Sequence, residues 1–251
     1  MGISGPRDDT MNSSGCVYVI ENGPLPPAIN MAVDEYLFRT RGQQLFTAES
    51  VILRIYSWDR PAWTIGYFQD FPHSLASSGT VVRRITGGGI VDHRQDLTFS
   101  LVFQLTHPLF GSRDRERSYR AINEIICDAL KTCGQHSELC ETPPEPDAPA
   151  RIRQCFSNPV RYDVVSHGIK LCGGAQRRDR RWILHQGSID LTHLSAISKD
   201  RLKDAFISVF PADEFIPIEL DDKAWQEIDT LAEGKYTREC WNIERYRPPI
   251  C

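Results

Sequence analysis

The chain has 251 residues and is nearly electroneutral, with 29 lysine and arginine residues against 33 aspartate and glutamate residues. Its 41% hydrophobic and 25% charged residues are typical of a globular protein, which excludes an intrinsically disordered chain and a collagen-like repeat. No apolar run approaches the roughly 20 residues of a membrane-spanning helix, and no signal peptide is recognisable. We therefore expect a cytoplasmic protein without membrane association. Residues 1–14 are polar and glycine-containing, and we interpret them as a flexible leader.

The spacing of apolar residues predicts helices and strands in an irregular order. In chain order it predicts a strand at 16–20, a helix at 28–41 that stops at Gly42, strands at 51–56, 63–67, 80–85 and 97–103, and a helix at 115–133. Residues 141–150, with four prolines and three acids, should form an exposed loop. Strands at 162–166, 169–172, 181–185 and 187–191 follow, then helices at 198–209 and 222–233. Because the helices are too few for a regular strand–helix alternation, the predicted fold class is α+β.

Eight cysteines raise the question of a metal site or of disulfides. No C-x-x-C pair occurs, so no metal site is expected, and without a secretory signal the thiols should be reduced. Cys155 stands out because Arg151, Arg153 and Arg161 are near it in sequence, and cationic neighbours favour the reactive thiolate. The alternative is that Cys155 is a small buried hydrophobic residue.

The charges are unevenly distributed along the chain. Residues 151–181 include eight basic and two acidic residues, a net charge of +6, whereas residues 204–233 include one basic and nine acidic residues, a net charge of −8. Such runs are either solvated surface or a rim that attracts an acidic or phosphate-bearing partner. A nucleic-acid partner is not expected, because the net charge is −4 and no binding module is recognisable.

A glycine-rich segment carries the strongest local signal. Gly87, Gly88 and Gly89 follow a predicted strand, where they leave room for a close ligand and where backbone N–H groups are able to bind an anion. Because side chains alternate along a strand, Arg83 and Arg84 should face opposite ways, and only one of them should point at a site. The alternative is a flexible glycine turn without a ligand.

A lysine lies in a second glycine-containing segment, Gly168-Ile169-Lys170-Leu171-Cys172-Gly173-Gly174. We expect Lys170 on a short strand that enters a small-residue turn, where its ammonium group is able to meet a carbonyl oxygen or a phosphate. A surface lysine before a hairpin turn is the alternative.

Together these segments resemble the lipoate–protein ligase and octanoyltransferase family, within the biotin/lipoyl protein ligase superfamily. The matching segments run in order along the chain: Asn30-x-Ala32-x-Asp34-Glu35, Arg54-x-Tyr56-x-Trp58, Arg83-Arg84-x-Thr86-Gly87-Gly88-Gly89 through His93, Lys170-x-x-Gly173-Gly174-Ala175-Gln176, His185-Gln186-Gly187-Ser188, and Lys235-Tyr236-Thr237 to Trp241-Asn242. Arg94 stands where the family usually has aspartate, and Gly174 where it usually has serine. The resemblance implies a mixed, largely antiparallel β-sheet core flanked by helices, like that of class II aminoacyl-tRNA synthetases.

Members of this family attach an octanoyl or lipoyl group to a lysine of a lipoyl-carrier domain, and they differ in how the acyl group is activated. Ligases use ATP and Mg²⁺ to form an acyl-adenylate, whereas octanoyltransferases move the acyl group from acyl carrier protein to an enzyme cysteine. The segment Cys155-Phe156-Ser157-Asn158-Pro159 matches the C-F-x-x-P segment of ligase-like octanoyltransferases, which favours transfer through Cys155. Arg161-Tyr162-Asp163-Val164 keeps a trace of the R-N-D-L segment of simple ligases, so ATP-dependent ligation is the alternative. A non-catalytic module that binds a lipoyl domain is a remote alternative.

The resemblance also implies the site residues. Cys155 is expected to be the nucleophile, and Lys170 to favour the thiolate and to stabilise the oxyanion with backbone N–H groups near Gly173 and Gly174. The substrate-binding residues carried over by the motifs are Arg83, Arg84, Thr86, Gly87, Gly88, Gly89, His93, Gly173, Gly174, Ala175, Gln176, His185 and Gly187. His93 or His185 is a candidate to accept the proton of the incoming amine, although either is alternatively a structural histidine.

The implied partners are acyl carrier protein as donor and a lipoyl domain as acceptor, from the glycine cleavage H protein or the E2 subunit of a 2-oxoacid dehydrogenase. The transferase needs no cofactor, whereas the ligase alternative needs ATP and Mg²⁺. We expect residues 15–251 to form a single catalytic domain that is monomeric. We also expect it to lack the C-terminal accessory domain, of about a hundred residues, that many bacterial ligases carry.

Overall fold

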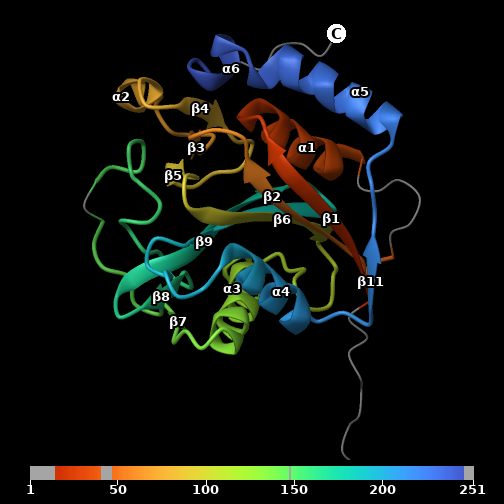
Figure 1. Cartoon of the computed structure of the whole chain (residues 1–251), viewed down its shortest axis with the longest axis vertical. Coiled ribbons are helices and arrows are strands. Elements are labelled where there is room, and N and C mark those ends of the chain that lie inside the picture. The colour runs from red at the N-terminus through yellow and green to blue at the C-terminus, as the bar shows by residue number, and fades with distance from the viewer. Residues whose placement is uncertain (1–14, 41–46, 147, 246–251) are drawn as a thin grey trace, which may run out of the picture.

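The structure is a computed structural model that describes residues 15–40, 47–146 and 148–245 (Figure 1). The expected leader at 1–14 and the helix stop at Gly42 lie outside the described residues. The helices are α1 (Pro27–Thr40), α2 (His73–Ala76), α3 (Arg115–Thr132), α4 (Lys199–Val209), α5 (Asp222–Leu231), the π-helical turn η1 (Ala232–Tyr236) and α6 (Glu239–Asn242). The strands are β1 (Cys16–Leu25), β2 (Val51–Trp58), β3 (Ala62–Ile65), β4 (Thr80–Arg83), β5 (Val91–Asp92), β6 (Asp96–Gln104), β7 (Glu138–Leu139), β8 (Val164–Ser166), β9 (Ile169–Arg178), β10 (Trp182–Asp190) and β11 (Glu214–Pro217).

The main sheet is mixed and largely antiparallel. Its strand order is β11-β1-β2-β6-β10-β9-β8-β7. β1 pairs in parallel with β2 and with β11, whereas the pairs from β2 to β7 are antiparallel. A smaller sheet of order β4-β3-β5 lies beside α2 (Figure 1). The predicted fold class and the expected sheet type are therefore confirmed.

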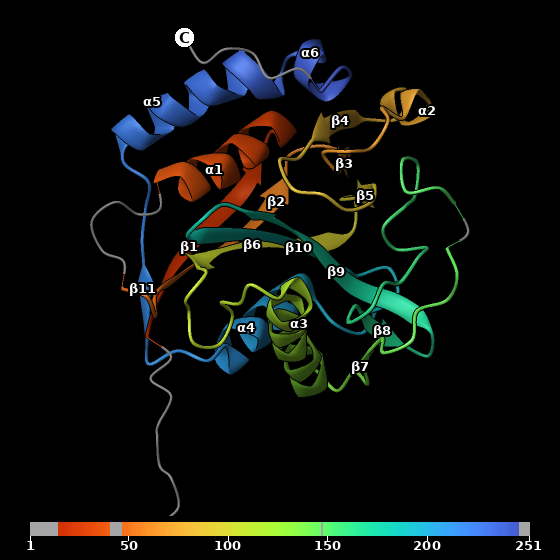
Figure 2. The ribbon, with the colours of Figure 1, turned by 180° about the vertical axis from the view of Figure 1, so that it is seen from behind.

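Helices cover both faces of the main sheet, so its central strands are buried on both sides. α1, α5 and α6 lie over one face, and α3 and α4 lie over the other (Figures 1 and 2). Along β6, Phe99, Leu101 and Phe103 join the core under α3 and α4, because alternate side chains of a strand point to the same face. Thr98 and Ser100 point to the opposite face, toward α1, although both are buried. Buried polar side chains need partners, so they mark this second face as the place to look for a site.

The helix predictions are confirmed for the described residues. α1, α3, α4 and α5 correspond to the four predicted helices, and Ser198 is the N-cap residue of α4, where its side chain accepts a hydrogen bond from a backbone N–H of the first turn. The predicted loop is also confirmed, because residues 141–146 and 148–150 contain neither helix nor strand and are mostly exposed.

Two strand predictions near the lysine motif are wrong. The predicted turn after Lys170 is the middle of β9, which continues to Arg178. A Cβ atom at Gly173 would lie 2.5 Å from Lys170 Cε, and one at Gly174 would lie 2.4 Å from His185 Nε2. These glycines therefore admit neighbouring side chains to a continuous strand and do not turn the chain. The strands predicted at 181–185 and 187–191 are likewise a single strand, β10.

No helix in the three described ranges combines the length and the apolar character that crossing a lipid bilayer requires.

Candidate active site

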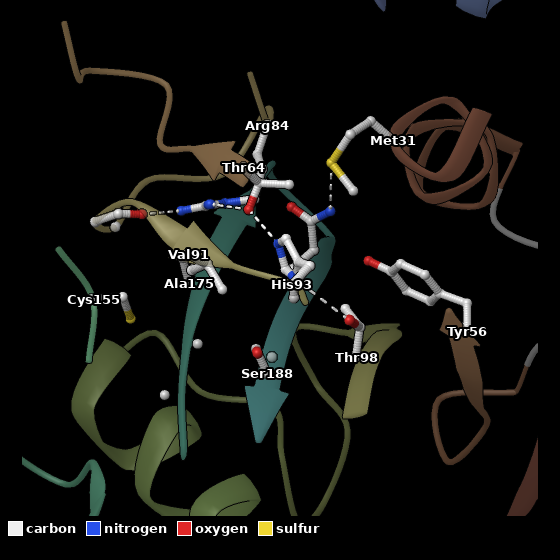
Figure 3. Close-up of a pocket in the computed structure, with 16 residues that line it drawn as sticks. Met31, Tyr56, Thr64, Arg84, Val91, His93, Thr98, Cys155, Ala175 and Ser188 are labelled. Carbon is white, nitrogen blue, oxygen red and sulfur yellow. Dashed lines mark hydrogen bonds between the residues drawn. The ribbon is translucent and has the colours of Figure 1, made fainter. Parts of the chain in front are cut away.

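A pocket lies on the α1 face of the main sheet, beside the smaller sheet (Figure 3). It encloses about 380 Å³ of empty space, counted together with the solvent-open volume at its mouth. The lining residues come from both sheets, from α1 and from the loop before β8: Met31, Tyr56, Thr64, Arg84, Gly88, Gly89, Val91, His93, Thr98, Cys155, Gly173, Gly174, Ala175, Gln186, Gly187 and Ser188. Segments far apart in the sequence thus meet around one cavity.

The loop that carries Cys155 is fixed to the glycine-rich segment by backbone hydrogen bonds. Ile90 N–H donates to the Arg153 carbonyl (3.0 Å), and Cys155 N–H donates to the Ile90 carbonyl (2.8 Å). A Cβ atom at Gly89 would lie 2.8 Å from the Arg153 oxygen, so only glycine allows the loop to approach so closely. Gln69 Nε2 donates to the same carbonyl oxygen (2.8 Å). The thiol is therefore held on ordered backbone, directly after the predicted exposed loop.

Cys155 and Lys170, which are 15 residues apart in sequence, are in contact. Lys170 Nζ donates a hydrogen bond to Cys155 Sγ at 3.3 Å, and it forms an ion pair with Asp163 Oδ2 at 2.7 Å. The Asp163 carboxylate is buried and also accepts a hydrogen bond from the Tyr119 hydroxyl. The motifs predict the cysteine and the lysine at one site, whereas Asp163 and Tyr119 were not among the predicted site residues.

The charges around Lys170 favour its ammonium form. Burial opposes this charge, but the neighbouring Cys155 and the ion pair with Asp163 outweigh burial and raise the pKa of Lys170 above its usual value. Burial, together with the Asp163 carboxylate, raises the pKa of Tyr119 well above its usual value. At neutral pH, Lys170 is therefore a cation in contact with the Cys155 sulfur, and Tyr119 is a protonated hydroxyl.

The backbone N–H of Gly174, which was expected to help bind the oxyanion, has another partner in the structure. Gly174 N–H donates to the Tyr119 hydroxyl oxygen at 2.8 Å, so this N–H is already occupied. Because the Tyr119 oxygen accepts from Gly174, its own proton is directed to Asp163. The positive group in hydrogen-bond contact with the thiol is the Lys170 ammonium group.

The two arginines of the glycine-rich segment face opposite ways, as alternation predicts. Arg84 lines the pocket and donates to Thr64 Oγ1 (2.6 Å) and to the carbonyl oxygens of Gly87 and Gly89. Burial lowers the pKa of Arg84 to about 10, so its guanidinium stays charged at neutral pH. Arg83 does not line the pocket.

Arg83 instead binds carbonyl oxygens outside the pocket. Its guanidinium donates to the oxygens of Gly66, Tyr67 and Gln69, and to those of Trp241 and Asn242 in α6. Arg83 thus joins the smaller sheet to the C-terminal part of the described chain.

A chain of hydrogen bonds crosses the pocket wall from Arg84 to Asp96. Thr64 Oγ1 accepts from Arg84 and contacts His93 Nε2 at 2.7 Å, while His93 Nδ1 contacts Asp96 Oδ2 at 2.7 Å. The His93 ring stacks on Trp58 with 4.1 Å between ring centroids. Figure 3 shows His93 in the middle of this wall. The neighbouring groups fix the orientation of the imidazole.

His185, the second candidate proton acceptor, faces away from the pocket. Its ring packs against Phe99 and Tyr119 on the α3 face of the sheet, and its side chain is fully buried. Burial lowers the pKa of His185 to about 3, so the ring is neutral. Gln176 points to the same face and donates to Ser118 of α3.

The pocket includes most, but not all, of the substrate-binding residues expected from the motifs. Those that line it are Arg84, Gly88, Gly89, His93, Gly173, Gly174, Ala175 and Gly187. Those that do not are Arg83, Thr86, Gly87, Gln176 and His185, which contact the residues around it.

The end of the pocket near α1 contains residues that sequence analysis did not identify as site residues. Gln186 donates to Asp34 Oδ2 (2.7 Å) and accepts from Thr86 Oγ1 (2.7 Å), and its amide nitrogen lies 3.7 Å from Met31 Sδ. Figure 3 shows Met31 and Tyr56 on the side of the pocket opposite Cys155. Side chains alternate along β10, so Gln186 and Ser188 point to the face opposite His185. Since His185 faces away from the pocket, this rule would have identified Gln186 and Ser188 as pocket residues.

No group of three or more histidine, cysteine, aspartate or glutamate side chains is arranged to hold a metal ion within residues 15–40, 47–146 and 148–245. In the same ranges the cysteines are free thiols: Cys16, Cys127, Cys133, Cys140, Cys155, Cys172 and Cys240.

Known proteins share the sequence pattern of this chain. Residues 26–208 match the family model described as lipoyl protein ligase A/B catalytic domain. An octanoyltransferase LipM from Kyrpidia tusciae is 35% identical, over 86% of this chain and 84% of its own length. An octanoyltransferase LipM from Bacillus anthracis is 28% identical, over 90% of this chain and 97% of its own length.

Solved structures share the fold. A chain of the bi-partite lipoate protein ligase from Thermoplasma acidophilum, reported with its E2 lipoyl domain, superposes with a TM-score of 0.68 at 24% sequence identity. The superposition covers 95% of this chain and 100% of that one, which agrees with the expected lipoyl-ligase-like fold. The family model covers most of this chain and the Kyrpidia tusciae relative exceeds 30% identity over most of its length, so the chain belongs to the lipoyl protein ligase A/B catalytic domain family.

Proposed function

We propose that this protein is an octanoyltransferase that moves an octanoyl group from acyl carrier protein to a lysine of a lipoyl domain, through a thioester on Cys155. The observation that carries the proposal is the 3.3 Å contact between Lys170 Nζ and Cys155 Sγ at a pocket lined by segments from both sheets. The relatives named octanoyltransferase LipM support this reaction.

The first step loads the enzyme. The Cys155 sulfur attacks the carbonyl carbon of the donor thioester, a new carbon–sulfur bond forms, and the bond to the carrier sulfur breaks. The proton lost by Cys155 ends on the departing carrier thiol. The Lys170 ammonium group stabilises the attacking thiolate and then the negative oxygen of the tetrahedral intermediate.

The second step transfers the octanoyl group to the acceptor. The neutral lysine amine attacks the Cys155 thioester, an amide bond forms, and the Cys155 thiolate leaves and takes up the proton that the amine releases. A lysine amine is mostly protonated at neutral pH, so this step needs a proton acceptor. His93 lines the pocket and its ring is held by Asp96, so His93 is the better candidate of the two histidines.

The pocket offers a place for the acyl chain. Glycine and alanine residues of β9 and of the glycine-rich segment form its walls, beside Val91, and they leave the backbone open to a narrow hydrocarbon chain. Met31, at the side opposite Cys155, would contact the tail of the chain. We propose that the acyl chain, bonded to Cys155 through its carbonyl carbon, extends along these residues toward Met31.

The proposed reaction needs no cofactor, whereas the ligase alternative needs ATP and Mg²⁺. Asp163 is the acid retained from the ligase-like segment, and here its carboxylate is fully buried and already accepts hydrogen bonds from Lys170 and Tyr119. The carboxylate therefore supports the lysine that contacts the proposed nucleophile, which fits the transferase. The proposal also places the enzyme in the cytoplasm, where its thiols stay reduced.

Mass spectrometry of the protein after incubation with octanoyl acyl carrier protein tests the proposal. We expect a hydroxylamine-labile octanoyl adduct on Cys155 and its transfer to a lipoyl domain. Cys155→Ala should abolish both, because no thioester forms without the thiol. The matched control is Cys240→Ser in α6, which should load and transfer like the natural protein.

Two outcomes would overturn the transferase. Acylation of a lipoyl domain from free lipoate or octanoate with ATP and Mg²⁺, unaffected by Cys155→Ala, would establish the ligase instead. Binding of the lipoyl domain without acylation from either donor would indicate a binding module.

A further inference from the structure

We propose that Asp163 is a positioning residue of this site, which keeps Lys170 charged and in place while Cys155 carries the acyl group, and that Tyr119 fixes the Asp163 carboxylate in turn. The inference rests on the proposed transfer through Cys155. It concerns the second step, in which the thioester is attacked by the acceptor amine.

The Asp163 carboxylate has no freedom to turn. Oδ2 accepts from Lys170 Nζ at 2.7 Å and from Val160 N–H at 2.6 Å, while Oδ1 accepts from the Tyr119 hydroxyl at 2.5 Å. Asp163 is 0% exposed, and Lys170 is 4% exposed. A buried carboxylate with three donors holds its partners at fixed positions.

The backbone before Asp163 is also unusual. Tyr162 has a φ of +67°, a left-handed conformation that non-glycine residues adopt only where the surroundings impose it. Tyr162 N–H donates to the Cys140 carbonyl at 2.7 Å, and its own carbonyl accepts from Asn123 Nδ2 at 2.8 Å. The guanidinium groups of Arg120 and Arg161 both contact its ring, with Cζ atoms 5.5 Å and 4.8 Å from the ring centroid. Contacts from α3 and from the loop after it thus stabilise the turn that directs Asp163 into the site.

Tyr119 connects this carboxylate to the wall of the acyl pocket. Its oxygen accepts from the N–H of Gly174, a residue of β9 that lines the pocket, and its proton is donated to Asp163. One hydrogen-bonded path therefore runs from Gly174 through Tyr119 and Asp163 to Lys170, and ends at the Cys155 sulfur.

The need for Asp163 follows from the charge on sulfur during the reaction. In the free enzyme, a Cys155 thiolate is able to balance the Lys170 ammonium. Once Cys155 is acylated, its sulfur is neutral, and among the contacts described here the Asp163 carboxylate is the remaining negative partner of Lys170. A buried ammonium group without a negative partner loses its proton, because burial disfavours the charged form. Asp163 therefore keeps Lys170 able to stabilise the oxyanion of the second step.

The test measures single-turnover transfer from the preformed octanoyl enzyme to a lipoyl domain, between pH 6 and pH 9. Asp163→Asn should still be loaded by octanoyl acyl carrier protein, because the thiolate still pairs with Lys170 in the free enzyme. Its transfer step should slow by roughly 100-fold at pH 8.5 and much less at pH 6.5, as expected when one oxyanion-stabilising group is lost. The acyl enzyme should then accumulate.

Two further variants make the test decisive. Tyr119→Phe removes the hydrogen bond to Asp163 Oδ1. Its transfer rate should also fall more at pH 8.5 than at pH 6.5, but by a smaller factor than in Asp163→Asn. This variant decides the question if Asp163→Asn does not fold. Asp128→Asn, an exposed carboxylate of α3, is the matched control and should leave the pH profile unchanged.

A pH profile parallel to that of the natural protein, with only a lower rate, would overturn the positioning role, because a structural defect lowers the rate equally at every pH. This failure is distinct from failure of the proposed function. If the natural protein forms no Cys155 thioester, the transferase itself is wrong, whatever Asp163 does.

Discussion

Gly173 shows how a residue acts at this site through the space that it leaves. The Lys170 side chain crosses the position that a Cβ atom at Gly173 would occupy, and it reaches Cys155 through this gap. Gly187 has the same role for the ring of Phe99, which lies 2.2 Å from the position of its missing Cβ. Lys170 fills the gap at Gly173 and contacts Cys155, whereas Phe99 fills the gap at Gly187 from the core behind the pocket wall.

Gly173→Ala should therefore lower activity without unfolding the protein. The new methyl group would lie 2.6 Å from Lys170 Nζ, and the flexible lysine side chain is the part that is able to move away. We expect loading of Cys155 to fall by roughly 100-fold, because the ammonium group leaves the sulfur. Quenched-flow assays with octanoyl acyl carrier protein, read out by mass spectrometry of the enzyme, measure the rate at which Cys155 is acylated.

Gly234→Ala in η1 is the control for this substitution, because nothing lies within 4 Å of a Cβ atom there. Its loading rate should be unchanged. If Gly173→Ala loads at the natural rate, the contact between Lys170 and Cys155 is not needed for the first step.

At the scale of elements, the loop with Cys155 depends on a neighbouring loop. Gln69 accepts from Gly66 N–H at 3.0 Å and donates to the Arg153 carbonyl at 2.8 Å, and Asp70 N–H donates to the Arg151 carbonyl at 3.0 Å. The turn after β3 and the loop before β8 are therefore a single hydrogen-bonded unit. Cys155, which this unit holds, lines the pocket.

Gln69→Ala should loosen the loop of Cys155 more than it destabilises the fold. The substitution removes two hydrogen bonds and leaves the buried Gly66 N–H without a partner, at a cost of about 1–3 kcal/mol. We expect faster hydrogen exchange at residues 151–155 and slower loading of Cys155, measured by mass spectrometry. If hydrogen exchange across this loop equals that of the natural protein, the backbone hydrogen bonds of Ile90 with Arg153 and Cys155 are sufficient to hold the loop without Gln69.

The elements also show how far the sequence predicts the fold. α1, α3, α4 and α5 have regular apolar spacing and are recognised from it. β11 (Glu214–Pro217) was not predicted, because it is a mostly exposed edge strand with an acid and a proline and lacks the alternation of a half-buried strand. The sequence predicts a turn at the glycines of β9, because the pattern of residue types does not show that the Lys170 and His185 side chains occupy the missing Cβ positions of Gly173 and Gly174.

For the site, motifs identified Cys155 and Lys170 but not the residues that hold them. Asp163 and Tyr119 are 44 residues apart, and only the packing of α3 against β8 and β9 brings them together. Local patterns do not contain such contacts. Alternation did separate Arg83 from Arg84, because that rule depends on neighbouring residues in one strand.

At the scale of the whole molecule, η1 and α6 near the C-terminal end of the described residues bind to α1 and to the strand that leads into the glycine-rich segment. Trp241 Nε1 donates to the Arg83 carbonyl at 2.9 Å, and the Arg83 guanidinium donates to the Asn242 carbonyl at 2.7 Å. Lys235 of η1 forms a buried ion pair with Glu35 of α1 at 2.6 Å. The motif at 235–242 therefore stabilises the segment that lines the pocket, although it does not line the pocket itself.

The stability of the whole molecule should fall steeply as the pH drops from 7 to 5. Burial lowers the pKa of His185 to about 3 and that of His107 to about 4, whereas both residues return to ordinary values near 6.5 in the unfolded chain. His107 Nδ1 accepts from the N–H groups of Leu109 and Phe110, so protonation would break both hydrogen bonds. Between pH 4 and pH 6.5 the unfolded chain therefore binds more protons than the folded one, and stability rises with pH.

The size of the effect follows from the same linkage. Each histidine should remove about 2 kcal/mol of the free energy of unfolding between pH 7 and pH 5, and the two together about 4 kcal/mol. The lowered pKa values of Asp96 and Glu35 act only at more acidic pH, because carboxylates of the unfolded chain titrate near pH 4. Urea denaturation at pH 7, 6 and 5 measures the slope, and His185→Gln should reduce it by about one proton. His193→Gln, at an exposed position, is the control and should leave the pH dependence of the free energy of unfolding unchanged. If His185→Gln also leaves it unchanged, His185 is not buried in its neutral form.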